Sequence, residues 1–189
     1  MPIIYPDHII AGHPPRRFTK YLGRDEIELA VQKTGREIHD RFKGEEIVFV
    51  GILTGCFMFM ADIARATGLP CTVDFIKLSS YGDGMEAGRI RLIKDIDCDI
   101  RDRHVIVVDD IVDTGNSWDF LKRFLMVRNP KSLSMAACFR KPKSLRAGVD
   151  VDFISLDLPD EFVIGYGLDY AGSARHLPDL YILDETEPK

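Results

Sequence analysis

Two short stretches of the sequence consist almost entirely of β-branched and other apolar residues: Ile47–Leu53 (IVFVGIL) and Val105–Val108 (VIVV). Such runs are typical of strands buried on both faces, which occur mainly in the interior of parallel sheets. Each run is followed by a polar turn and then by a segment predicted to be helical, Phe57–Ala66 after the first and Ser117–Arg128 after the second. Repeated strand–turn–helix units predict an α/β fold with a mainly parallel, twisted sheet flanked by helices.

Hydrophobic periodicity predicts further elements on both sides of these two units. An amphipathic helix is expected over Arg24–Phe42, where apolar residues recur at helical spacing, and a polar, glycine-rich loop over Ser79–Gly88. Ligands bind at the carboxyl ends of parallel strands, so the polar side chains that follow Leu53 and Val108 are expected to share a site. The remaining predicted strands are Thr72–Leu78, Arg89–Ile93, Ser132–Phe139, Val151–Ser155 and Phe162–Gly165.

Length and composition limit the class of protein. A chain of 189 residues with 46% hydrophobic and 29% charged residues suits one globular domain over residues 1–189. The net charge of −5 disfavours a nucleic-acid partner. The longest apolar run is too short to span a bilayer, so no membrane association is expected. The amino-terminal residues lack the pattern of a signal peptide, and the four cysteines form no CxxC pair. We therefore expect a cytoplasmic protein with reduced thiols.

The segment Val105–Ser117 (VIVVDDIVDTGNS) carries the clearest chemical pattern. A buried strand presents two adjacent carboxylates, Asp109 and Asp110, which can accept hydrogen bonds from a pair of vicinal hydroxyls. The turn that follows opens a helix, so the backbone N–H groups of Thr114–Ser117 can point into one anion-binding concavity. Gly115 permits unusual backbone dihedrals there. A diol and a phosphate together describe a ribose 5-phosphate. The alternative is that these polar residues only cap the helix and form a solvated turn.

This segment resembles the phosphoribosyl pyrophosphate signature of the type I phosphoribosyltransferases, and the resemblance extends from about Ile47 to about Leu177. The fold implied is a core over about residues 24–157, with a small hood formed by about residues 1–20 and 158–189. The family also implies Mg²⁺ and a homodimer or homotetramer. Four further segments are similar to the hypoxanthine-guanine branch in particular: Val48–Ala61 (VFVGILTGCFMFMA), Asp74–Tyr81 (DFIKLSSY), Phe139–Pro142 (FRKP) and Leu158–Tyr170 (LPDEFVIGYGLDY).

The resemblance implies a role for each matching position around the ribose and its phosphates. Asp113 would act as general base or acid beside N7 of the purine, and Arg175 would contact the pyrophosphate. Ser80 and Tyr81 would belong to a flexible loop that closes over the reacting centre. Asp109 and Asp110 would bind the ribose hydroxyls and, with Asp169, the metal. The 5-phosphate would lie on Thr114, Gly115, Asn116 and Ser117, and the pyrophosphate loop would be Leu53, Thr54 and Gly55, with a non-proline cis peptide before Gly55.

The purine would be recognised by three residues near the carboxyl terminus. Phe162 would stack on the base, and the backbone of Val163 would contact its edge. Lys141 would donate to the 6-oxo group, and a lysine can satisfy an oxygen acceptor but not an exocyclic amine. The expected reaction is transfer of the 5-phosphoribosyl group from phosphoribosyl pyrophosphate to a 6-oxopurine, hypoxanthine or guanine, giving IMP or GMP and pyrophosphate.

One position departs from the family pattern. The family often has a lysine or arginine where this chain has Thr54, so a cation near the pyrophosphate is missing. This departure leaves a regulatory alternative open, and a different base is a separate alternative. The chain could be a regulatory protein that senses phosphoribosyl pyrophosphate, or a transferase for another base such as xanthine or a pyrimidine.

Overall fold

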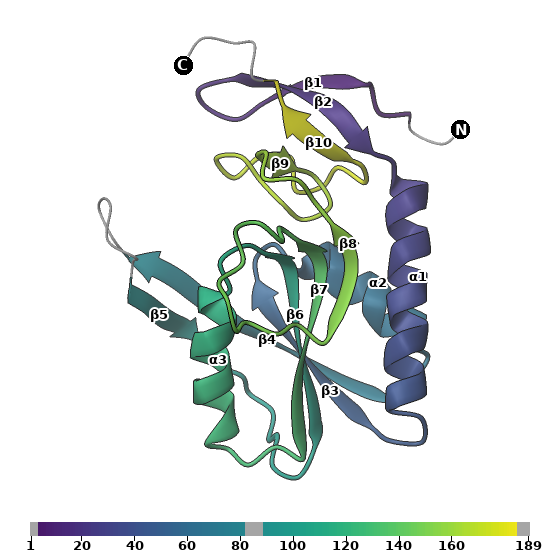
Figure 1. Ribbon diagram of the computed structural model, residues 1–189, viewed down its shortest axis with the longest axis vertical. Helices are drawn as coiled ribbons and strands as arrows, with labels where there is room; N and C mark the ends of the chain where they lie inside the picture. The colour runs from purple at the N-terminus through teal and green to yellow at the C-terminus, as the bar shows by residue number, and fades with distance from the viewer. Residues whose placement is uncertain (1–3, 82–88, 185–189) are drawn as a thin grey trace.

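The computed structural model describes residues 4–81 and 89–184. Its larger sheet has the strand order β5-β4-β3-β6-β7-β8, and neighbouring strands run parallel except for the antiparallel pair β4 and β5 (Figure 1). This arrangement confirms the predicted α/β fold with a mainly parallel sheet. The strands are β3 (Ile47–Leu53), β4 (Cys71–Tyr81), β5 (Arg89–Lys94), β6 (His104–Val112), β7 (Ser132–Arg140) and β8 (Phe153–Asp157).

Helices cover both faces of the larger sheet, as the fully apolar strands require. Helices α1 (Arg24–Arg41) and α2 (Phe57–Thr67) pack on one face, and α3 (Asn116–Met126) packs on the other (Figure 1). Alternate residues of the central strands divide between the two cores: Phe49 faces α1 and α2, whereas Val50 faces α3. No helix within residues 4–81 and 89–184 is long and apolar enough to cross a membrane.

A smaller antiparallel sheet lies above the larger one and has the order β1-β2-β10-β9 (Figure 1). Its own core contains Phe18, Ile164 and Tyr181. This sheet is the hood expected from the family resemblance, because segments near both ends of the chain build it. Its strands are β1 (His8–Ala11), β2 (Arg16–Leu22), β9 (Val163–Ile164) and β10 (Leu180–Leu183).

Several element boundaries differ from the predictions because strand pairing continues past the apolar runs. Strand β6 continues beyond Val108 to Val112, since Asp109 to Val112 still pair with β7. Strand β4 continues to Tyr81, where a loop was predicted from Ser79, because its last residues pair with β5. The rest of that predicted loop, residues 82–88, lies outside the described residues. Strands β8 and β9 are shifted or shortened relative to prediction, and β1, β2 and β10 were not predicted.

Candidate active site

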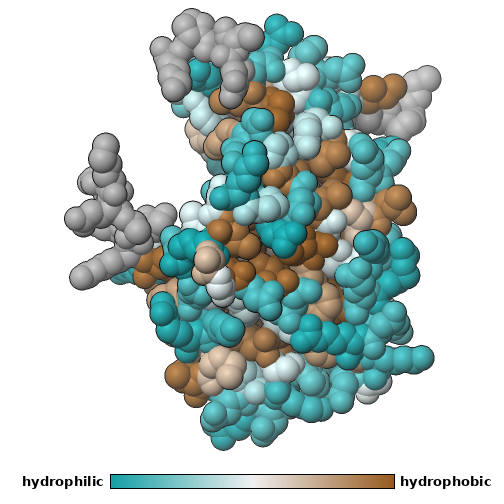
Figure 2. All heavy atoms as spheres, viewed as in Figure 1, coloured by the Kyte–Doolittle hydropathy of each residue, from teal (hydrophilic) through white to brown (hydrophobic). Residues whose placement is uncertain are grey.

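A cleft of about 420 Å³ opens where the carboxyl ends of β3 and β6 meet the smaller sheet. Apolar residues gather midway up the molecule at this level, between the two sheets (Figure 2). Ile52, Ile111 and Leu168 also line the cleft and were not predicted, since an apolar residue there gives no local signal. The predicted site residues that line it are Leu53, Thr54, Gly55, Asp109, Asp110, Asp113, Lys141, Phe162, Val163, Asp169 and Arg175.

The remaining predicted residues fall into two groups. A smaller hollow of about 110 Å³ adjoins the cleft and shares Asp109 and Asp113 with it, and its lining includes Thr114, Gly115, Asn116 and Ser117. Ser80 and Tyr81 form the end of β4, and the loop that would follow them is outside the described residues.

The Gly55 backbone lies very close to the Asp110 side chain and to the Gly167 backbone in the lining of the cleft. A Cβ atom added to Gly55 would lie 1.6 Å from Oδ2 of Asp110. A Cβ atom added to Gly167 would lie 2.1 Å from the carbonyl oxygen of Gly55. Glycine is therefore required at position 167, where the overlap is with backbone, whereas a side chain at position 55 would force the Asp110 carboxylate to move. The cis peptide bond joins Leu53 to Thr54 and is thus one bond earlier than predicted.

The two adjacent aspartates form the acidic centre of the cleft. Burial raises the pKa of Asp109 well above its usual range, and the neighbouring charge of Asp110 raises it further. Burial also raises the pKa of Asp110, although the positive charge of Arg175 acts in the opposite direction. A buried carboxylate, Asp109, beside a half-buried one, Asp110, is costly as an anion unless a cation or hydroxyl donors compensate it. The pair is therefore suited to bind a diol or a metal-bearing ligand.

Asp169 and Arg175 contact each other in the loop that precedes β10. Nη2 of Arg175 lies 2.6 Å from Oδ1 of Asp169, and its Nη1 donates to the carbonyl oxygen of Gly167 at 2.7 Å. The other carboxylate oxygen of Asp169 accepts the backbone N–H of Gly172 at 2.7 Å. Arg175 is thus held beside the cleft by two acceptors, which sequence alone did not indicate.

The carboxylates of the cleft bear on metal binding. Among the residues that the structure describes, no group of three or more His, Cys, Asp or Glu side chains is arranged to hold a metal ion. Asp109, Asp110 and Asp169 therefore do not form a complete protein cage. This arrangement still fits a hard cation such as Mg²⁺, which commonly binds through one or two carboxylates together with water and substrate phosphates.

The predicted purine-binding residues Lys141, Phe162 and Val163 also line the cleft. The Phe162 side chain is 44% exposed, and its ring centroid lies 5.9 Å from that of Tyr170 in an edge-on contact. An exposed aromatic face held by neighbouring rings can stack on a base. The backbone N–H of Lys141 donates to the carbonyl oxygen of Val112 at 3.0 Å, and its Nζ reaches the carbonyl oxygen of Asp160 at 3.4 Å. The lysine that was predicted to contact the 6-oxo group is thus tied to the strand that carries the aspartates.

The turn before α3 has the conformation expected of an anion-binding loop. Gly115 is the N-cap of α3 and has φ +81° and ψ 6°, in the left-handed region that favours glycine. Within the described residues, neither Asp113 nor Ser117 caps this helix, and the hydroxyl of Thr114 accepts the N–H of Asn116 at 3.5 Å, the long limit of a hydrogen bond. The N–H groups that follow in the first turn of α3 have no side-chain acceptor in the described part of the chain and can face a ligand.

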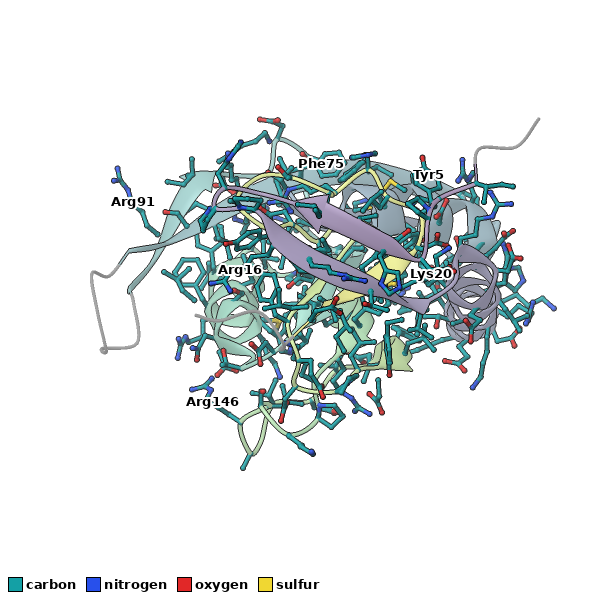
Figure 3. The ribbon with its side chains drawn as sticks, turned by 90° about the horizontal axis from the view of Figure 1, so that it is seen from above. Tyr5, Arg16, Lys20, Phe75, Arg91 and Arg146 are labelled. Carbon is teal, nitrogen blue, oxygen red and sulfur yellow. The ribbon has the colours of Figure 1, made fainter. Side chains whose placement is uncertain are left out.

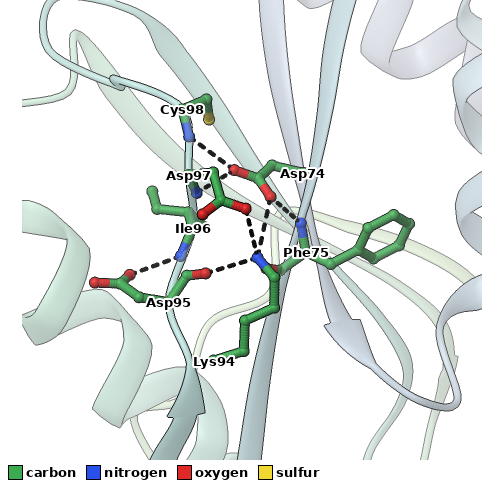
Figure 4. A network of polar contacts seen from close by, with 7 residues as sticks. All are labelled: Asp74, Phe75, Lys94, Asp95, Ile96, Asp97 and Cys98. Atoms are coloured by element: carbon green, nitrogen blue, oxygen red, sulfur yellow. Dashed lines mark hydrogen bonds and ion pairs between the residues drawn. The ribbon is translucent and has the colours of Figure 1, made fainter.

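A polar network fixes the base of the β4–β5 hairpin, which leads toward Ser80 and Tyr81 (Figure 4). Oδ2 of Asp74 accepts the backbone N–H groups of Asp97 at 2.6 Å and Cys98 at 2.9 Å. Nζ of Lys94 lies 3.6 Å from Oδ1 of Asp74 and donates to the carboxylate of Asp97 at 3.0 Å. Asp74 belongs to a segment that resembles the family, but the sequence did not predict this anchoring contact.

Comparison with known proteins identifies the family. The model of the phosphoribosyl transferase domain matches residues 19–171. The chain belongs to this family. The hypoxanthine phosphoribosyltransferase of Salmonella typhimurium is 45% identical over 166 residues, which cover 85% of this chain and 93% of the relative. The hypoxanthine-guanine phosphoribosyltransferase of Aquifex aeolicus is 37% identical over 166 residues, covering 87% and 93%.

Solved structures agree with this assignment. The crystal structure of a hypoxanthine-guanine phosphoribosyltransferase from Bacillus anthracis superposes with a TM-score of 0.81 at 34% identity, covering 87% of this chain and 96% of that one. These similarities confirm the predicted family and fold. They favour an enzyme of purine salvage over the regulatory alternative. Enzymes of this family use a divalent metal ion.

Proposed function

We propose that this phosphoribosyltransferase joins hypoxanthine or guanine to phosphoribosyl pyrophosphate, giving IMP or GMP and pyrophosphate. One observation carries the proposal: a single cleft is lined by the adjacent carboxylates Asp109 and Asp110 of β6 and also by Lys141 and Phe162. The adjoining hollow, lined by the turn before α3, supplies amide donors for a 5-phosphate. The cleft can thus hold the sugar and the base of one product nucleotide.

The proposed reaction breaks the bond between the anomeric carbon of the ribose and the pyrophosphate oxygen and forms a bond to a purine nitrogen. Positive charge develops on the ribose as the leaving group departs, as in glycoside cleavage. Asp109 and Asp110 would hold the ribose hydroxyls, which fixes the sugar relative to the base. Asp113, which lines both hollows, would accept the proton that the purine loses.

The leaving group would be held at the opposite side of the cleft. Thr54 is exposed and brings no cation, so Arg175 would supply the fixed positive charge beside the pyrophosphate. Mg²⁺, when bound, would neutralise the remaining charge of the pyrophosphate. Its protein ligands would come from Asp169, Asp109 and Asp110, with water and phosphate oxygens completing the shell.

Phe162 and Lys141 would select a 6-oxopurine. The Phe162 ring offers a stacking face, and the ammonium group of Lys141 offers donors but no acceptor. An exocyclic amine at the 6 position would leave that ammonium unpaired, so adenine is expected to be a poor substrate. Competition among hypoxanthine, guanine and xanthine would rank the accepted bases.

Replacement of Asp113 by Asn tests the proposal. With phosphoribosyl pyrophosphate, Mg²⁺ and hypoxanthine present, we expect Asp113→Asn to lower kcat by about 10²-fold, because the general base is lost. Asp40→Asn, an exposed carboxylate on α1, is the matched control and should keep kcat unchanged. Wild-type turnover by Asp113→Asn would contradict its assigned role. Binding of phosphoribosyl pyrophosphate without any nucleotide product from the unmodified chain would favour a sensor.

We further infer a cytoplasmic homodimer or homotetramer. Phe57, at the start of α2, is 39% exposed beside Thr54, whereas Phe59 and Met60 of the same helix are buried in the core. The exposed ring of Phe57 could pack against a second subunit and so contribute apolar area to a contact between subunits. Sedimentation equilibrium of the full chain would measure the oligomeric state.

A further inference from the structure

The segment of residues 141–150 connects the purine end of the cleft with the predicted phosphate loop. After Lys141 it turns and packs against the start of α3. The indole N–H of Trp118 donates to the carbonyl oxygen of Asp150 at 3.0 Å. A Cβ atom added to Gly115 would lie 2.6 Å from a methyl carbon of Val149. This segment therefore packs directly against the turn and first turn of the helix that would hold the 5-phosphate.

Within this segment, Arg146 contacts both the turn before α3 and the first turn of the helix. Its backbone N–H and its Nε both donate to the carbonyl oxygen of Thr114, at 3.5 Å and 3.3 Å. Its Nη2 also pairs with the carboxylate of Asp119 in the first turn of α3. The backbone N–H of Asp119 in turn donates to the carbonyl oxygen of Gly115 at 3.1 Å. One guanidinium thus joins the start of the turn to the start of the helix, and it lies at the margin of the molecule (Figure 3).

The geometry of the peptide bond gives this contact a consequence for anion binding. In a trans peptide the C=O of Thr114 and the N–H of Gly115 point in opposite directions. Arg146 does not line the hollow, whose lining in the described part of the chain comes from Asp109, residues 111–118 and Met135. Holding the carbonyl oxygen toward Arg146 therefore points the Gly115 N–H away from Arg146, and Gly115 itself lines the hollow. The same contact keeps a carbonyl oxygen from facing the phosphate.

The positive charge of Arg146 also favours anion binding at this turn. Asp113 and Asp119 both carry negative charge close to a loop that must accept a dianionic phosphate. The ion pair with Arg146 offsets the charge of Asp119. The pair is about half exposed, so its electrostatic effect is screened and the orientation of the turn is the larger contribution.

We propose that Arg146 is a positioning residue for the 5-phosphate loop, acting through the Thr114 carbonyl and Asp119 rather than by touching the substrate. The proposal rests on the assignment of Thr114–Ser117 as the 5-phosphate site. It assigns a function to a residue that no motif in the sequence singled out.

The test uses two ligands that each occupy one half of the site. For Arg146→Met, the Kd for ribose 5-phosphate and the KM for phosphoribosyl pyrophosphate should both rise about tenfold, the effect of one hydrogen bond from a charged group. The Kd for magnesium pyrophosphate and the kcat should change by less than about twofold. Arg123→Met removes an exposed cation from the last turn of the same helix and should leave all four quantities unchanged.

Two results would overturn the proposal: unchanged binding of ribose 5-phosphate by Arg146→Met, or an equal loss for ribose 5-phosphate and pyrophosphate. If Arg146→Met does not fold, Arg146→Lys carries the same test, since one ammonium cannot reproduce the planar, two-sided contact. Ser117→Ala separates this proposal from the site assignment. If Ser117→Ala weakens ribose 5-phosphate binding and Arg146→Met does not, the positioning role fails and the site stands. If neither variant weakens it, the 5-phosphate assignment fails, and the Arg146 proposal fails with it.

Discussion

Replacement of Gly55 by alanine is the sharpest steric test of the cleft. The added methyl group would lie 1.6 Å from Oδ2 and 2.5 Å from Cγ of Asp110. Contacts shorter than 3.0 Å essentially never occur for a Cβ atom, so the carboxylate and the methyl group must separate by about 1.4 Å more. The carbonyl oxygen of Gly55 is itself packed against Gly167, which restricts movement of the loop and leaves the carboxylate to move.

The expected magnitude follows from that displacement. A shift of about 1.4 Å exceeds the width of the normal hydrogen-bond range, so Asp110 would lose its contact with a ribose hydroxyl. A hydrogen bond to a charged group contributes about 1.5–3 kcal/mol, which corresponds to a loss of roughly 10- to 150-fold in kcat/KM. Crowding would also lower the free energy of unfolding by about 1–3 kcal/mol.

The assay is the rate of IMP formation over a range of phosphoribosyl pyrophosphate concentrations, with thermal unfolding measured in parallel. Gly23→Ala is the matched control, because its added Cβ atom would lie 3.7 Å from the nearest side-chain atom, an ordinary contact distance. A folded Gly55→Ala protein whose kcat/KM stays within about twofold of wild type would refute the reasoning. Asp110 would then not contact the ribose in the arrangement described.

Two further predictions concern pH and metal. Burial by itself would raise the pKa of Asp74, but the N–H groups of Cys98, Phe75 and Asp97 together hold that pKa below its usual range. Its stabilising effect is therefore present above about pH 4 and is lost as the pH falls through the lower folded-state value. Asp74→Asn should lower the free energy of unfolding by about 1–2 kcal/mol at pH 7 and by less at pH 3, and equal losses in denaturant titrations would contradict this. Removal of divalent metal with a chelator should abolish nucleotide formation, and excess Mg²⁺ should restore it; full activity without divalent metal would exclude the proposed metal requirement.

Local sequence determined the elements that bury apolar residues and the order of the site motifs. The runs that became β3 and β6 had to be apolar because helices cover both of their faces. The turn at Gly115 followed from a strand, a glycine and a helix in direct succession. These features depend on neighbours in the chain, so periodicity and turn chemistry were sufficient to find them.

Only the tertiary structure decided how distant segments meet. The smaller sheet pairs β2 with β10, from opposite ends of the chain, and such pairing leaves no periodic signal in either strand. The close approach of Gly55 to Asp110, the contact of Asp169 with Arg175 and the bridge from Arg146 to Thr114 likewise join residues far apart in sequence. The residue types predicted what the cleft could bind. The packing of separate loops determined which side chains face the ligand and which residues position those side chains. Sequence alone does not give these long-range contacts, because the whole fold fixes them.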